Sequence, residues 1–164
     1  MAFLFTGPAG MQPVANTETA AKHVLGTIAV GHDPVYGTGE FIYLLGVAST
    51  AVGSVVTYDA TTYQTVLSAV GGNIPRPIAI AMSANGAAAY GWYQISGLAT
   101  VKKTCTISLA AGAAVAVLTT GLIAGTGSGK EIQGAVVAAV ASATAGRTTV
   151  SVMLARPTKQ GRVT

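Results

Sequence analysis

The side chains that could carry acid–base or metal chemistry are few in this chain. The carboxylates and imidazoles are spread over the sequence: Glu18, His23, His32, Asp33, Glu40, Asp59 and Glu131. Acid–base catalysis needs such groups at one reacting atom, and a metal needs His, Cys or carboxylate ligands at close spacing. His23 and His32 have no such spacing, while Asp33 and Asp59 stand in turn-like contexts, where aspartate typically caps backbone amides. We therefore expect neither a catalytic acid–base pair nor a metal site.

A glycine-rich segment, residues 124–131, is the sharpest local motif. It reads AGTGSGKE and looks like the phosphate-binding loop of nucleotide hydrolases. That loop needs a Ser or Thr after its Lys to hold magnesium, whereas Glu131 follows Lys130 here and would repel a phosphate. The loop must also join a buried strand to a helix, with a metal-binding acid on another strand. We interpret the segment as the flexible tip of a β-hairpin.

Nucleophilic chemistry has equally little support. Cys105 is the single cysteine, so no internal disulfide is available to it, and its alternating context indicates a small buried hydrophobe. Only Lys102 and Lys103 stand near enough in sequence to activate a thiolate. The segment 127–129 lacks the spacing of a Gly-x-Ser-x-Gly nucleophile elbow. We expect no enzymatic activity and no cofactor.

Aromatic residues gather at Tyr90, Trp92 and Tyr93. In a strand, alternation places Tyr90 and Trp92 on one face and Tyr93 on the other. The favoured interpretation is a core Trp with two half-buried Tyr. The alternative is a protein-interface anchor, because Trp and Tyr concentrate binding energy where one end of the side chain is apolar and the other is wet. All three are therefore candidate interface residues.

Composition narrows the classes of partner. Apolar residues make up 51% of the 164 residues and charged residues only 9%, far below the roughly 25% of ordinary soluble proteins. No unbroken run of about 20 apolar residues is present, so we expect no membrane span. The net charge is +4, but the basic residues are scattered and form no nucleic-acid footprint. The composition suits a protein whose apolar surface is covered by other subunits.

The elements that position these residues begin with an expected N-terminal arm, residues 1–21. Its apolar tip, Phe3, Leu4 and Phe5, precedes a Gly/Pro-rich connector that cannot bury it locally. We expect the arm to contribute no core element, its tip to dock on a neighbouring subunit, and the rest of the chain, 22–164, to fold without it as one β-domain. The first basic residue is Lys22, so a secretory signal is not expected. We expect synthesis in the cytoplasm of the cell that makes the protein.

Period-2 patterning with frequent turn residues predicts an all-β fold, an antiparallel β-sandwich or barrel-like domain. Turns are expected at Asp33-Pro34, 37–39, 71–73 and Asn85-Gly86. The predicted strands are 23–30, 40–47, 54–58, 64–67, 78–82, 89–96, 98–101, 115–118, 132–138 and 148–154. The Ala-rich stretch 134–145 leaves a short helix as an alternative, because Ala is the strongest helix former.

Three blocks of sequence carry a resemblance. They are LGT at 25–27 with DPVYG at 33–37, GEFIYLLGVASTAVGSVVTY at 39–58, and AIAMS at 79–83 leading to YGWYQISG at 90–97 and to Lys102-Lys103. Together these blocks resemble the head decoration, or cement, proteins of tailed bacteriophages. The resemblance implies a Gly-rich β-domain that packs on a capsid surface, often as a trimer, with no catalytic residues.

The expected function is therefore a virion structural protein on the capsid surface that binds the major capsid protein and itself, as a homotrimer. Two alternatives remain open. One is another virion component, such as a tail, fibre or head-to-tail joining protein, although no repeat of the kind a fibre shows is present. The other is a carbohydrate- or receptor-binding β-module that uses the cluster Tyr90–Tyr93.

Overall fold

The computed structural model describes residues 12–69, 74–104, 107–125, 130–141 and 148–160, together with the backbone of Leu4 and Phe5. These residues form twelve strands and no helix. The strands are β1 (Leu4–Phe5), β2 (Thr17–Glu18), β3 (Ile28–Asp33), β4 (Gly37–Leu45), β5 (Val55–Tyr58), β6 (Thr65–Leu67), β7 (Ile78–Ala81), β8 (Tyr90–Lys102), β9 (Ala114–Thr119), β10 (Leu122–Gly125), β11 (Glu131–Val137) and β12 (Thr149–Lys159). The all-β prediction is confirmed. The described residues include no helix with the length and apolarity that crossing a membrane requires.

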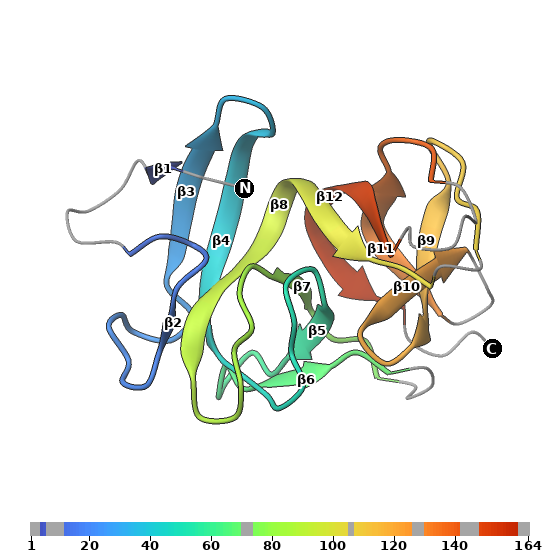
Figure 1. Cartoon of the computed structure of the whole chain (residues 1–164). Helices are drawn as coiled ribbons and strands as arrows, with labels where there is room; N and C mark the ends of the chain where they lie inside the picture. Colours follow the sequence, from blue (N-terminus) through green and yellow to red (C-terminus); the bar gives the residue numbers. More distant parts are fainter. Residues whose placement is uncertain are drawn as a thin grey trace.

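All strand pairs are antiparallel, and they form one sheet that curls into a half-barrel, in the order β1-β3-β4-β8-β12-β11-β9-β10. Strands β2 and β7 add to β8, and β5 and β6 continue from β7. Figure 1 shows β8 running from the side of β3 and β4 to the side of β9–β12. The first part of β8 pairs with β4, and its second part pairs with β12.

Strand β8 bends at Gly97, which lies at φ +91°. The sequence predicted two strands here, 89–96 and 98–101, but the structure has one strand of 13 residues. Glycine adopts a positive φ without the steric cost that a Cβ imposes, so the strand turns a corner without ending. Strand β10, which pairs with β9, was not predicted from the sequence.

The glycine-rich segment 124–131 joins β10 to β11, and these two strands lie on opposite sides of β9. The hairpin interpretation is therefore wrong, because a hairpin needs its two strands to pair with each other. A strand follows the segment where a phosphate-binding loop requires a helix. The alternative helix at 134–145 is also wrong over residues 134–137, which belong to β11, and residues 142–147 lie outside the described part.

The interior holds three hydrophobic clusters, and β4 and β8 separate two of them. Phe41, Tyr43 and Trp92 point to one side of these strands, where they pack with Val14, Ala29 and Met82. The opposite side carries Ile42, Leu44, Val56, Ala79, Ala81, Tyr93 and Ile95. The third cluster lies between β9–β12, the second part of β8, and β5 and β7. Strand β4 and the first part of β8 are thus covered on both faces.

The N-terminal segment covers the aromatic side of β4 and β8. Val14 is only 2% exposed and belongs to the cluster of Trp92 and Tyr43, and the two residues of β2 pair with Gly91 and Tyr90. The interpretation of 1–21 as an arm without a core element is wrong for these residues. An isolated Val between Pro13 and Ala15 shows no periodicity, so the sequence did not reveal its role. The division at 21/22 as a domain boundary stays a prediction.

Candidate functional site

Two of the interface candidates predicted from the sequence, Trp92 and Tyr93, are core residues. Trp92 and Tyr93 are fully buried and lie in opposite clusters, as strand alternation predicts. Tyr90 is half-buried and stacks on Tyr43 at 6.3 Å between ring centroids. The interface interpretation is therefore corrected for Trp92 and Tyr93, because a side chain enclosed by its own chain has no surface to offer a partner.

At the tip of the N-terminal segment, Leu4 and Phe5 form β1, whose backbone pairs with His32 and Gly31 of β3 in the same chain. The side chains of Leu4 and Phe5, and the whole of Phe3, lie outside the described residues, as does Cys105. Docking of this tip on a neighbour stays a prediction.

The two histidines occupy separate places. His23 packs edge-on against Tyr43, with 5.2 Å between ring centroids, and its Nε2 lies 3.0 Å from Oε1 of Gln12. His32 lies exposed on β3 beside the hydroxyl of Thr38. The described residues contain no group of three His, Cys, Asp or Glu side chains that could hold a metal ion.

Two aspartates cap turns, as their sequence contexts indicated. Asp33 Oδ1 accepts hydrogen bonds from the backbone amides of Val35 and Tyr36 at 2.8 and 2.9 Å. Asp59 accepts bonds from the amides of Thr61 and Thr62, and these bonds hold the pKa of its carboxyl below the ordinary value. Both groups stabilise loops.

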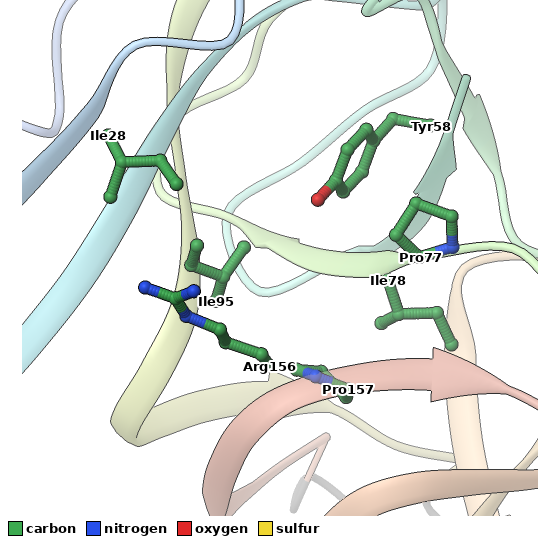
Figure 2. Close-up of a pocket in the computed structure, with 7 residues that line it drawn as sticks. All are labelled: Ile28, Tyr58, Pro77, Ile78, Ile95, Arg156 and Pro157. Atoms are coloured by element: carbon green, nitrogen blue, oxygen red, sulfur yellow. The ribbon is translucent and has the colours of Figure 1, made fainter. Parts of the chain in front are cut away.

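A small pocket lies where β3, β5, β7, β8 and β12 meet, and we call it the junction pocket. It has a volume of about 150 Å³ and is lined by Ile28, Tyr58, Pro77, Ile78, Ile95, Arg156 and Pro157. Figure 2 shows the Tyr58 hydroxyl and the Arg156 guanidinium as the polar tips among apolar side chains. This volume suits a single apolar side chain and is below the roughly 300–1,000 Å³ of typical ligand pockets.

A distortion of β12 brings Arg156 to the junction pocket. The register between β11 and β12 jumps from Gln133↔Thr158 to Ala135↔Leu154, so Gly134 faces three residues of β12. Arg156 lies in this bulge at φ +46°, a conformation uncommon for residues with a Cβ. Bulges redirect side chains. Here Arg156 forms a two-pronged ion pair with Glu40 of β4, its Nε and Nη2 donating at 2.9 and 3.1 Å.

The electrostatics of the pocket follow from these contacts. The hydrogen bonds from Arg156 hold the pKa of Glu40 below its ordinary value, against a smaller opposing effect of burial. Burial raises the pKa of Tyr58, helped by Tyr63 and opposed by Arg156, so its hydroxyl stays neutral and can donate a hydrogen bond. The pocket thus offers apolar walls and hydrogen-bond donors, with no nucleophile and base side by side among its lining residues.

The ion pair predicts a pH-dependent stability difference between the wild type and Glu40→Gln. Because the pKa of Glu40 is lowered on folding, its contribution is present above the ordinary carboxyl pKa, about 4.3, and is lost as the pH falls through the lower folded value. Urea midpoints should therefore differ slightly at neutral pH and converge in acid. The effect is small because Arg156 is largely exposed. Glu131→Gln is the control, since Glu131 makes no ion pair with a described residue; a gap that widens in acid would contradict the prediction.

A second surface lies on the outer side of β8, β12, β11 and β9, and we call it the four-strand face. Leu98, Met153, Val136 and Ala114 are successive cross-strand partners and form one apolar row. Met153 and Val136 are 46% and 44% exposed. Beside this row lies a hollow of about 370 Å³ with uncharged lining residues: Tyr36, Thr100, Ala139, Val140, Ala141, Thr149, Val150 and Ser151. The face therefore suits an uncharged protein surface that has both apolar and polar groups.

Neither surface carries a sequence motif. Glu40 and Arg156 are 116 residues apart, and the row of the four-strand face draws one residue from each of four strands. The junction pocket and the four-strand face can be recognised only from the register between the strands. No protein-family model matches this chain, and no curated protein matches it either.

Proposed function

We propose that this chain is a virion structural protein that decorates and stabilises a phage capsid by binding the lattice of the major capsid protein. The observation that supports the proposal most is the four-strand face, an apolar row with two exposed members, Met153 and Val136, flanked by an uncharged hollow. Exposed apolar patches of this kind typically mark protein–protein contact sites. The resemblance of residues 25–103 to head decoration proteins indicates the major capsid protein as the partner.

Copies of the chain are also proposed to associate as a homotrimer. Side chains as apolar as Val24, Val35 and Val140 are 70–80% exposed in the single chain. Association covers such side chains and protects sheet edges. Light scattering should give a mass near three times 16.2 kDa, and a monodisperse monomer would contradict the trimer.

The structure weakens one alternative from the sequence. A carbohydrate-binding module that uses the cluster Tyr90–Tyr93 needs exposed aromatic rings on which sugars can stack, and Trp92 and Tyr93 are fully buried. The other alternative is a tail, fibre or joining protein. The location of the protein in purified particles distinguishes this role from capsid decoration. Purified particles should contain it in tail-less heads; its presence only in tails would overturn the decoration role.

A charge placed on the four-strand face tests that surface directly. Met153→Asp should weaken co-sedimentation of the protein with heads by tenfold or more, because about 1.4 kcal/mol of lost binding corresponds to a factor of ten and a buried, unpaired carboxylate costs more. Val66→Asp is the matched control, because Val66 is similarly exposed, 51%, on β6 outside the face. Equal losses in both variants would show that the four-strand face is not the contact surface. Circular dichroism checks that both variants fold.

A further inference from the structure

The loop between β7 and β8 contains the dipeptide Asn85-Gly86. An asparagine followed by glycine is chemically labile, because the unhindered amide nitrogen of glycine can reach the asparagine side chain and displace ammonia. Asn16 and Asn73, the other asparagines of the chain, are followed by Thr17 and Ile74, whose branched side chains hinder that attack. Asn85 is thus the most reactive asparagine of the unfolded chain.

In the folded chain Asn85 is fully buried. Its side chain lies against two glycines: a Cβ on Gly91 would come within 2.2 Å of Asn85 Nδ2, and one on Gly46 within 2.7 Å of Asn85 Cβ. Neither glycine could carry a side chain without moving Asn85. Two backbone segments therefore pack closely against this side chain and restrict its rearrangement.

The backbone around Asn85 is fixed as well. The Gly86 carbonyl accepts a hydrogen bond from the Ala89 amide at 3.2 Å, and the Gly46 amide donates to the Ala89 carbonyl at 2.7 Å. Cyclisation needs the Gly86 nitrogen to approach the Asn85 side-chain carbon, and hydrolysis of the ring needs water. The packing restricts the approach of the Gly86 nitrogen, and it excludes water from the Asn85 side chain.

Uncharged side chains lie beside Asn85. It lies beside the hydroxyl of Tyr93, whose pKa is raised by burial and lowered in part by the neighbouring side chains of Asn85 and Thr65. The Asn85 amide is uncharged, whereas a carboxylate at this position would be a buried charge, and neither Tyr93 nor Thr65 is a cation that could pair with it. Such a charge is strongly destabilising unless it is paired.

We propose that Asn85 is a deamidation site controlled by folding: it is protected in the folded chain, reacts when the chain unfolds, and then prevents refolding. The Gly86 nitrogen bonds to Asn85 Cγ, the Cγ–Nδ2 bond breaks, and Nδ2 leaves as ammonia with the proton from the Gly86 amide. Water then opens the cyclic imide to aspartate or isoaspartate. Unfolding becomes irreversible because the product places a carboxylate, or an extra backbone carbon, between Gly46 and Gly91.

The first experiment compares the folded protein with the same protein unfolded in urea, both incubated at mildly alkaline pH. Peptide mass spectrometry follows the change from amide to carboxyl at Asn16, Asn73 and Asn85. Asn85 should convert much faster than the other two in urea and remain intact in the folded protein. Conversion at equal rates in folded and unfolded samples would overturn the proposal, and so would an Asn85 that reacts no faster than Asn16 in urea.

The second experiment tests refolding with Gly86→Ala. A Cβ on Gly86 meets no atom within 4 Å and the residue has no positive φ, so this variant should fold normally. Its alanine hinders cyclisation, so the refolded yield after a long incubation in urea should exceed that of the wild type several-fold. Equal yields would show that deamidation does not limit refolding.

A third variant, Asn85→Asp, mimics the product, with Asn16→Asp as a control at an exposed position. Asn85→Asp should be far less stable than Asn16→Asp, or fail to fold. Equal urea midpoints for the two variants would overturn the claim that the product is excluded from the fold.

Discussion

Deletion of residues 1–21 should lower the stability of the remaining chain strongly. The deletion removes Val14 from the cluster of Tyr43 and Trp92 and removes β2 from the edge of β8. Burial of a Val side chain contributes roughly 1.5–3 kcal/mol, and the uncovered aromatic rings add to the loss. We expect a loss of at least about 3 kcal/mol, which corresponds to about 6–12 °C in the thermal midpoint for a chain of this size.

A shorter deletion, of residues 1–11, provides the control because it keeps Val14 and β2. Thermal unfolding should be followed by circular dichroism at one protein concentration, because association also shifts the midpoint. If the chain without residues 1–21 unfolds at the temperature of the full chain, Val14 and β2 do not stabilise the fold, and the whole segment is a dispensable arm.

Gly97→Ala should be among the most damaging single substitutions in the chain. A Cβ at this position would lie 2.5 Å from the backbone carbonyl oxygen of Thr38 and 3.0 Å from Cα of Gly39. Both obstacles are backbone atoms, so β8 would have to separate from the start of β4. The positive φ of Gly97 adds a cost of about 1–2 kcal/mol for any residue with a Cβ. We expect a total loss above about 4 kcal/mol.

Gly112→Ala separates the two causes. Gly112 also has a positive φ, +77°, but a Cβ there meets nothing within 4 Å. Its substitution should therefore cost only the conformational part, about 1–2 kcal/mol. Chemical denaturation of both variants measures the difference. Similar losses in the two variants would mean that β8 and β4 can move apart at Gly97 without cost.

The strands were predicted best where successive side chains alternate clearly between the two faces of the strand. Strand alternation at β8 predicted Tyr90 and Trp92 on one side and Tyr93 on the other, and the structure confirms this arrangement. The turn at Asp33-Pro34 was also predicted, because an aspartate before proline typically accepts backbone amides.

The features that were not predicted from the sequence have physical explanations. Gly97 looked like a strand end because glycine commonly marks a turn, and only the paired strands on both sides keep β8 continuous through it. Val14 joins the core through contacts with residues far along the chain. The junction pocket and the four-strand face depend on register and on a bulge at Arg156, and local sequence patterns carry no information about either.

Strand β8 contributes side chains to all three hydrophobic clusters: Trp92 to one, Tyr93 and Ile95 to the second, and Ala99 and Val101 to the third. Loss of this strand would expose every part of the interior at once, so the clusters cannot open one at a time. Hydrogen exchange should show this as cooperativity, with the amides of residues 92–101 exchanging only when the entire molecule opens. The edges β6 and β10 should exchange earlier, through local fluctuations that leave β8 intact.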